Sequence, residues 1–249
     1  MNILITGGRS DMAQAMTKGF IQKGHEVIVT ASSMQSKDEV ESLYKNLGLK
    51  VKVKVIIFDF RNLEQAEKNI DDLILNTRID GVILNAWKKV EELKLFEEYT
   101  GTEVDEELNH NIKAQVLLLQ KLLPKMKENQ FGRILNISSV IAISGSNKYG
   151  LYALGKAAIE GLIRNIAVDY GQYNILANSL RPGIIKTERT KKFWEREAYQ
   201  KRVSRFIPQK KLGEAQQIAN AAMALMEEDS YITGAELNVS GGLPLMTSG

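Results

Sequence analysis

Short apolar runs rich in β-branched residues alternate along the chain with longer stretches in which apolar residues recur every three or four positions. The short runs have the length and composition of buried strands, and the longer stretches have the period of amphipathic helices. The predicted strands are residues 3–6, 26–30, 51–58, 81–85, 133–138, 175–180 and 236–239. The predicted helices are residues 12–23, 37–47, 63–75, 103–127, 151–170 and 214–226.

This alternation predicts an α/β fold with a doubly wound parallel sheet. Parallel neighbours need a crossover of about a dozen residues or more, and helices supply it. Right-handed crossovers then place helices on both faces of a Rossmann-like sheet. No internal repeat or Pro/Gly-rich linker interrupts residues 1–249, so we expect a single domain.

One segment, residues 186–211, breaks the rhythm. It is rich in Lys and Arg, with Phe193, Trp194, Tyr199 and Phe206 interleaved. A solvated helix pair whose aromatic side chains pack on the body is one interpretation. We favour the other, a lid over a substrate, because the segment follows a strand end at the ligand-binding edge of the sheet.

Composition narrows the classes of function. A chain of 249 residues with 44% apolar and 25% charged residues is typical of soluble globular proteins. The absence of cysteine excludes disulfides and thiolate ligands, and His25 and His110 lack a metal-ligand spacing, so we expect no metal site. No apolar run approaches the roughly 20 residues of a membrane span, and the N-terminus does not resemble a signal peptide. A cytoplasmic protein without a membrane partner is expected, and a net charge of +3 is too small to predict nucleic-acid binding.

The first predicted strand runs into Thr-Gly-Gly-Arg-Ser-Asp-Met-Ala at residues 6–13, which opens the first helix. A glycine-bearing turn of this kind directs backbone N–H groups and the helix N-terminus toward a phosphate. Asp11 and Ala13 stand at the second and third glycine positions of the usual dinucleotide motif. Ala13 still permits close packing, whereas Asp11 places a negative charge near phosphate unless it caps the helix. The expected cofactor contacts here are Gly7, Arg9, Ser10 and Met12.

The end of the second predicted strand favours NADP over NAD. It continues as Ala31-Ser32-Ser33, without the acidic residue that binds the ribose hydroxyls of NAD. Arg9 and Ser32 can instead bind the additional phosphate of NADP through charge-assisted hydrogen bonds. Asp59, after the third strand, has two open interpretations: a contact with adenine, or a cap for the helix that begins near Asn62.

Candidate chemistry lies in the second half of the chain. Tyr152 and Lys156 are one helical turn apart and therefore share a helix face. Ser139 follows the fifth predicted strand directly. An ammonium beside a phenol favours the phenolate, so we expect Lys156 to lower the pKa of Tyr152. This arrangement predicts a general acid or base acting on an oxygen whose carbon exchanges hydride.

The chain also carries further motifs, which with those above give the ordered set Thr6-Gly7, Asp59, Asn85-Ala86, Asn111, Ser139, Tyr152, Lys156, the stretch 181–187 and the stretch 231–242. This ordered set resembles the short-chain dehydrogenase/reductase family, and the resemblance extends from Asn2 to about Pro244. The resemblance implies that Tyr152 is the general acid/base, that Ser139 orients the substrate oxygen and that Lys156 binds the nicotinamide ribose. Asn111 would hold a water molecule in a proton relay. The implied cofactor contacts are Asn85, Ala86, Tyr152, Lys156, Pro182, Gly183, Ile185 and Thr187.

Within the family, the chain resembles the 3-oxoacyl-(acyl carrier protein) reductases, which implies an NADP-dependent ketoreductase acting on a small-molecule or carrier-bound carbonyl substrate. Trp87 departs from the pattern, because the family has a glycine there, and the indole could narrow the site or form a wall of the substrate pocket. Tyr149 lies seven residues before Lys156, as in the enoyl-acyl-carrier-protein reductase branch, so reduction of a C=C bond is an alternative. A non-catalytic nucleotide sensor is a second alternative, motivated by Asp11 and Trp87.

The two longest predicted helices carry broad apolar stripes. By the resemblance, these helices pair across a twofold axis and give a homodimer or homotetramer. Surface lysines near residues 121–127 and the basic segment 186–211 would also suit an acidic carrier protein. The stripe residues are Val116, Leu117, Leu119, Leu122, Ala157, Ile159, Leu162 and Ile166.

Overall fold

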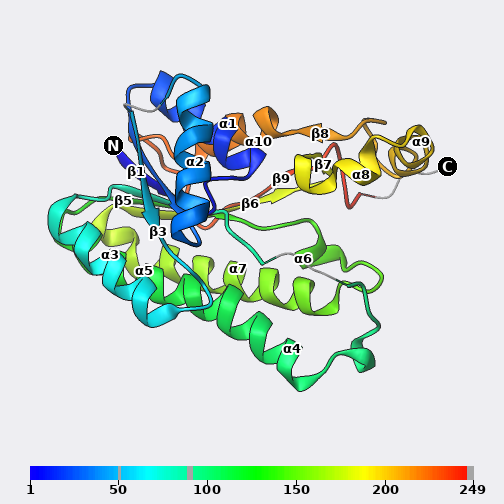
Figure 1. The fold of residues 1–249 in the computed structure, drawn as a ribbon, viewed down its shortest axis with the longest axis horizontal. Coiled ribbons are helices and arrows are strands. Elements are labelled where there is room, and N and C mark those ends of the chain that lie inside the picture. The colour runs from blue at the N-terminus through cyan, green and yellow to red at the C-terminus, as the bar shows by residue number, and fades with distance from the viewer. Residues whose placement is uncertain (50–51, 89–91, 246–249) are drawn as a thin grey trace.

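A seven-stranded, fully parallel sheet in the order β3-β2-β1-β4-β5-β6-β9 forms the centre of the computed structural model, which describes residues 1–49, 52–88 and 92–245 (Figure 1). All seven predicted strands are found, with ends that differ by at most two residues. Val51, the predicted start of the third strand, lies outside the described residues. The strands are β1 (Asn2–Ile5), β2 (Glu26–Ala31), β3 (Val53–Ile57), β4 (Gly81–Leu84), β5 (Gly132–Ile137), β6 (Ile175–Pro182) and β9 (Glu236–Val239).

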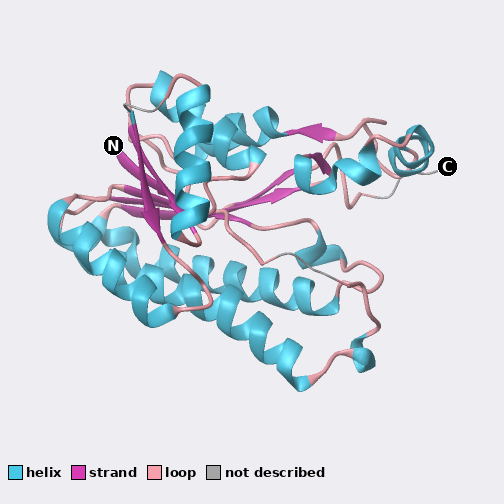
Figure 2. Ribbon diagram, in the orientation of Figure 1, coloured by secondary structure: helices cyan, strands magenta, loops and turns pink. Residues whose placement is uncertain are grey.

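Helices cover both faces of this sheet, as predicted. Figure 2 shows α1, α2 and α10 on one side of the strands and α3, α5 and α7 on the other. The helices are α1 (Asp11–Gln22), α2 (Met34–Asn46), α3 (Leu63–Asn76), α4 (Gly101–Glu106), α5 (Ala114–Glu128), α6 (Ile141–Ser144), α7 (Gly150–Tyr170), α8 (Lys191–Trp194), α9 (Glu197–Ser204) and α10 (Ala215–Leu225).

The alternation of side chains along each strand builds two cores. Ile3 and Ile5 of β1 face the layer of α1 and α10, whereas Leu4 between them faces the layer of α3, α5 and α7. All three side chains are fully buried. Strands with apolar residues on both sides suit a sheet that is covered on both faces, which is why continuous apolar runs identified them in the sequence.

The predicted helix 103–127 is interrupted. Its middle turns form the π-helix η3 (Glu107–Lys113), between α4 and α5. A π-turn accommodates extra residues in a helix without ending it and is frequent at functional sites. Asn111 lies in this π-helix and is completely buried.

The segment 186–211 folds into short elements: the two-residue strand β7 (Ile185–Lys186), the 3-10 turn η5 (Glu188–Thr190), α8 and α9. β7 pairs with β8 (Gly213–Glu214), outside the main sheet. Figure 1 shows this segment beyond the carboxyl ends of the strands. The lid function of this segment remains a prediction.

Four of the eight stripe residues that suggested oligomerisation are buried within the protein itself. Leu119, Leu122, Ile159 and Ile166 are at most 3% exposed and belong to the core under the sheet. The other four stripe residues are partly or fully exposed. Among the described residues, no helix is both long enough and apolar enough to cross a membrane.

Candidate functional site

The strand order reverses between β1 and β4, where ligands bind in sheets of this kind. Thr6 connects the carboxyl ends of β1 and β4 by hydrogen bonds. Its hydroxyl accepts from the backbone N–H groups of Asn85 and Ala86, both at 2.9 Å. The Asn85 amide in turn donates to the Thr6 carbonyl at 2.8 Å. This bonding fixes the floor of the crevice.

The glycine turn after β1 needs its first glycine. Gly7 has a φ of +75°, and a Cβ there would lie 3.1 Å from the Cα of Ala86. Ser10 caps α1, with its hydroxyl accepting from the Ala13 N–H at 3.2 Å. The N-terminus of α1 therefore opens onto the crevice, where it favours a negatively charged group.

Asp11 is not the helix cap that one interpretation of the sequence proposed, because Ser10 already fills that position. The Asp11 carboxylate instead accepts a hydrogen bond from the backbone N–H of Glu188 at 3.0 Å. It thereby links the glycine turn to η5 across the crevice.

A cleft of about 590 Å³ extends from the glycine turn past the end of β4. This volume lies within the range of small-molecule and cofactor sites, roughly 300–1,000 Å³. The predicted cofactor residues on its wall are Gly7, Arg9, Ser10, Met12, Ser32, Asp59, Asn85, Ala86 and Thr187. Pro182, Gly183, Ile185, Tyr152 and Lys156 do not line it, and the Ile185 side chain packs against the core.

Asp59 lines the cleft but does not cap α3. Asn62 is the cap, accepting from the Gln65 N–H at 3.2 Å, so the capping interpretation of Asp59 is wrong. The Asp59 carboxylate pairs with the Arg61 guanidinium at 2.9 Å. The contact with adenine remains a prediction.

Tyr152 lies in the first turn of α7, largely buried. Burial raises the pKa of this phenol, and the Ser139 hydroxyl and the Arg189 charge lower it only in part. The expectation of a lowered pKa is therefore wrong for the free protein. Spacing in the sequence places a cation near the phenol but says nothing of the loss of water around both groups. At neutral pH the Tyr152 hydroxyl keeps its proton.

Lys156 is 3% exposed, one turn further along α7. Its ammonium donates to the Ile137 carbonyl at 2.7 Å and lies 3.7 Å from the ring centroid of Trp87. Burial lowers the pKa of Lys156 to about 7; the charges of Glu107 and Glu160 oppose this shift, and that of Arg189 adds to it. Lys156 is thus itself destabilised as a cation, which limits its effect on Tyr152.

Trp87 fits beside α7 because residue 155 is glycine. A Cβ at Gly155 would lie 2.7 Å from Cζ2 of the Trp87 indole and 2.6 Å from Oε1 of Glu107. The indole packs over Lys156 and edge-on to Tyr152, at 6.1 Å between ring centroids. The indole expected to shape the substrate pocket therefore also packs on two predicted catalytic side chains.

Glu107 connects Asn111 to this cluster. The Asn111 amide donates to Oε2 of Glu107 at 2.8 Å and accepts from the Lys88 N–H at 2.7 Å. Burial raises the pKa of Glu107. Both polar atoms of the Asn111 side chain are therefore used within the protein, and its place in a proton relay remains a prediction.

The charged residues of the site that the sequence did not reveal include Glu107 and Arg189. Glu107 stands four residues before Asn111 in a helix, where an acidic side chain looks like an ordinary surface charge. Arg189 is one of many basic residues in the segment 186–211. Gly155, next to Lys156, was the one hint in the sequence, because a glycine on a helix face allows a side chain from another element to pack closely there.

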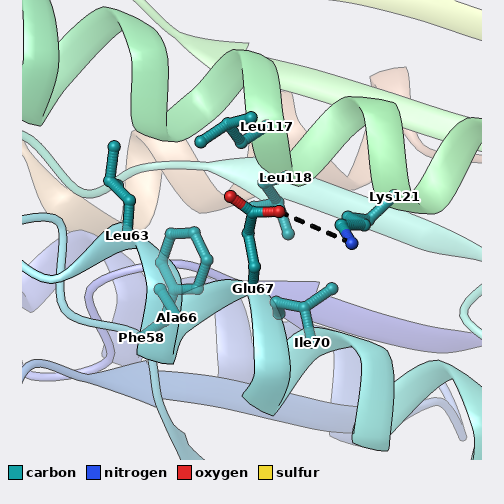
Figure 3. Close-up of a pocket in the computed structure, with 8 residues that line it drawn as sticks. All are labelled: Phe58, Leu63, Ala66, Glu67, Ile70, Leu117, Leu118 and Lys121. Atoms are coloured by element: carbon teal, nitrogen blue, oxygen red, sulfur yellow. Dashed lines mark ion pairs between the residues drawn. The ribbon is translucent and has the colours of Figure 1, made fainter.

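A smaller hollow between α3 and α5 is not a site. Figure 3 shows its lining of Phe58, Leu63, Ala66, Ile70, Leu117 and Leu118, with Glu67 and Lys121 at its edge. Lys121 pairs with Asp71 at 2.9 Å and Glu67 at 3.5 Å, so its charge is already compensated. Among the described residues, no cluster of His, Cys, Asp and Glu could hold a metal ion.

Known proteins resemble this chain over nearly its full length. A family model described as Enoyl-(Acyl carrier protein) reductase matches residues 7–244. A 3-oxoacyl-(acyl-carrier-protein) reductase of Thermotoga maritima is 31% identical over 243 residues, covering 96% of both chains. The dehydrogenase/reductase SDR family member 4 of Oryctolagus cuniculus is 28% identical over 243 residues, 97% of this chain and 92% of the relative. A solved structure of ElxO with NADP bound is 27% identical, covers 97% of both chains and has a TM-score of 0.87.

Proposed function

The chain belongs to the short-chain dehydrogenase/reductase family, and from that premise we propose that it reduces a ketone to a secondary alcohol with hydride from NADPH. It is an oxidoreductase acting between a nicotinamide cofactor and a carbonyl or alcohol group. The bound cofactor supplies the hydride. The cleft suits a dinucleotide, because Gly7 allows close approach and the N-terminus of α1 attracts phosphate.

The side chain that supports an acid role in ketone reduction is Tyr152, whose partly buried phenol has a raised pKa. As hydride reaches the carbonyl carbon, the carbonyl oxygen gains negative charge and needs a proton. A phenol whose pKa is raised by burial still holds that proton at neutral pH and can transfer it as the alcohol forms. Ser139, next to Tyr152, donates a hydrogen bond to the same oxygen.

NADP is preferred over NAD in this proposal. Ser32 and Arg9 line the cleft after β2. Arg9 pairs with Glu39 at 2.8 Å, but the guanidinium side chain is 74% exposed, so exchanging that carboxylate for a phosphate involves little desolvation. The similar protein ElxO was solved with NADP bound, which supports the preference.

The proposal predicts the outcome of a simple assay. Purified protein should oxidise NADPH when a ketone is added and should favour NADPH over NADH, by about tenfold or more in kcat/KM if one charge-assisted contact carries the choice. The Arg9→Gln variant should narrow that ratio without changing the reaction. Reduction of conjugated C=C bonds but not ketones would favour the enoyl-reductase alternative, in which Tyr149 replaces Tyr152. NADPH binding without turnover of any carbonyl would favour the sensor.

The substrate is a small molecule or is held by a carrier protein; the relatives named 3-oxoacyl-(acyl-carrier-protein) reductases support the second form. We further infer that the protein is a homodimer or homotetramer. Exposed apolar side chains on α7, just before β9 and on the edge strand β9 support this, since exposed edges and apolar patches favour association. They include Leu154, Val168, Ile232 and Leu237. Sedimentation at micromolar concentration that shows only a monomer would contradict it.

A further inference from the structure

Four cationic side chains line the cleft, and three of them have a carboxylate partner. Arg9 pairs with Glu39, Arg61 with Asp59 and Lys88 with Glu106. Arg189 differs. Among the described residues its guanidinium has no carboxylate partner, and its hydrogen bond is a long one to the Trp87 carbonyl at 3.5 Å.

Arg189 occupies the boundary between the cleft and the predicted catalytic side chains. It lies on η5, two residues after Thr187, and reaches from this turn to the loop that follows β4. Its charge is close enough to act on the phenols of Tyr149 and Tyr152 and on the ammonium of Lys156. An anion bound to it would stand beside the group that donates a proton to the carbonyl.

The guanidinium is poorly solvated for a cation that has no carboxylate partner among residues 1–49, 52–88 and 92–245. Arg189 is exposed as a residue, yet the surrounding protein removes enough water from its charged end to lower its pKa. A cation in that position gains from an anion, because a charge-assisted bond replaces lost hydration. The planar guanidinium fork matches the two oxygens of a carboxylate.

The positive charge of the segment 186–211 around Arg189 also favours an anionic ligand. Residues 186–211 contain ten Lys and Arg against three Glu, whereas the whole chain has a net charge of +3. The rest of the chain is therefore net negative, and the positive charge is concentrated beside the active-site cleft. Such a field raises the local concentration of anionic ligands.

We propose that the carbonyl substrate carries a carboxylate and that Arg189 binds it, holding the carbonyl against Ser139 and Tyr152. This assignment names the substrate class of the proposed function and rests on it. Short oxo acids belong to this class. The number of carbon atoms between their carboxylate and their carbonyl would have to match the distance from the Arg189 guanidinium to the Tyr152 hydroxyl.

The test compares oxo acids with their methyl esters, which keep the carbonyl and remove the charge. The 2-, 3- and 4-oxo acids are each assayed with NADPH beside the matching ester. The parent protein should prefer one of the acids, and Arg189→Gln should lower kcat/KM for that acid by about 10- to 100-fold while changing the ester by less than about threefold. Arg189→Lys, which keeps the charge but not the fork, should recover part of the loss.

Arg205→Gln is the matched control, since it removes one exposed positive charge from the same segment. If Arg205→Gln lowers kcat/KM for the acid as much as Arg189→Gln does, the overall positive charge of the segment selects the substrate, as it would for an acidic carrier protein. That result would overturn the proposal. Titration of NADPH without substrate tests whether Arg189 binds the cofactor instead. If Arg189→Gln binds NADPH more weakly, and if kcat/KM falls equally for the acid and the ester, the guanidinium binds a cofactor phosphate and the carboxylate site is rejected. If the parent reduces esters as well as acids, the ketoreductase function stands and this inference fails.

Discussion

Tyr152→Phe is expected to lower kcat for ketone reduction by about 10²- to 10⁴-fold, the usual contribution of a positioned general acid. The change removes only the phenol oxygen. The ring stays in place against Trp87, at 6.1 Å between centroids, so the cleft keeps its shape. NADPH binding, followed by fluorescence titration, should remain within about threefold of the parent, because the lost group acts only as charge develops on the substrate oxygen.

Tyr149→Phe is the matched control for this variant. Its ring lies 6.0 Å from that of Tyr152, so the two substitutions make the same chemical change in neighbouring positions. Tyr149→Phe should keep the rate of ketone reduction within a few-fold of the parent. A large loss with Tyr149→Phe and little loss with Tyr152→Phe would transfer the acid role to Tyr149 and reject the tetrad assignment.

The sheet was predictable because its strands are buried on both faces. Runs such as the one in β1 contain apolar residues on both sides, and the polar residues that follow them mark the carboxyl edge where Thr6, Asn85 and Ser139 lie. The π-helix η3 was not predictable, since a local change in helical period leaves no clear mark in the order of residues. The short helices α6, α8 and α9 are too brief to show a period.

The predicted site residues come from spacing, which fixes the helix face but not the surroundings. Tyr152 and Lys156 do share a face of α7, and the Lys156 ammonium lies 5.8 Å from the Tyr152 ring centroid. Their electrostatics depend on Trp87 and Glu107, which come from other elements and enter the space left by Gly155. For this reason the sign of the pKa shift of Tyr152 followed from the structure and not from the sequence.

The buried Lys156 should lower the free energy of unfolding of the free protein at neutral and acidic pH, because the folded state then has to bury a positive charge. Its pKa is about 7 in the folded protein and near 10.4 when unfolded. Below pH 7 both states bind the proton, and the folded state carries the whole cost of burying the charge. Between these two pKa values the unfolded state binds more protons, so this group's contribution to the free energy of unfolding rises with pH.

Lys156→Met is therefore expected to abolish turnover and yet raise the free energy of unfolding by about 1–4 kcal/mol near pH 6. The gain should shrink as the pH approaches about 10, because the parent lysine is then neutral in the folded state. Part of it is offset at every pH, since the variant loses the contact of the ammonium with the Trp87 ring and its hydrogen bond to Ile137. Urea unfolding of both proteins across this range measures the difference directly.

Lys18→Met provides the comparison, because Lys18 is exposed to solvent on α1. The difference in unfolding free energy between this variant and the parent should be small and independent of pH. If Lys156→Met behaves like Lys18→Met, the ammonium is well solvated in the free protein. Lys156 would then keep its proton throughout the neutral range, and its positive charge would favour the phenolate form of Tyr152. The slope of stability against pH therefore decides whether Lys156 stands beside Tyr152 as a cation or as a largely neutral amine in the free protein.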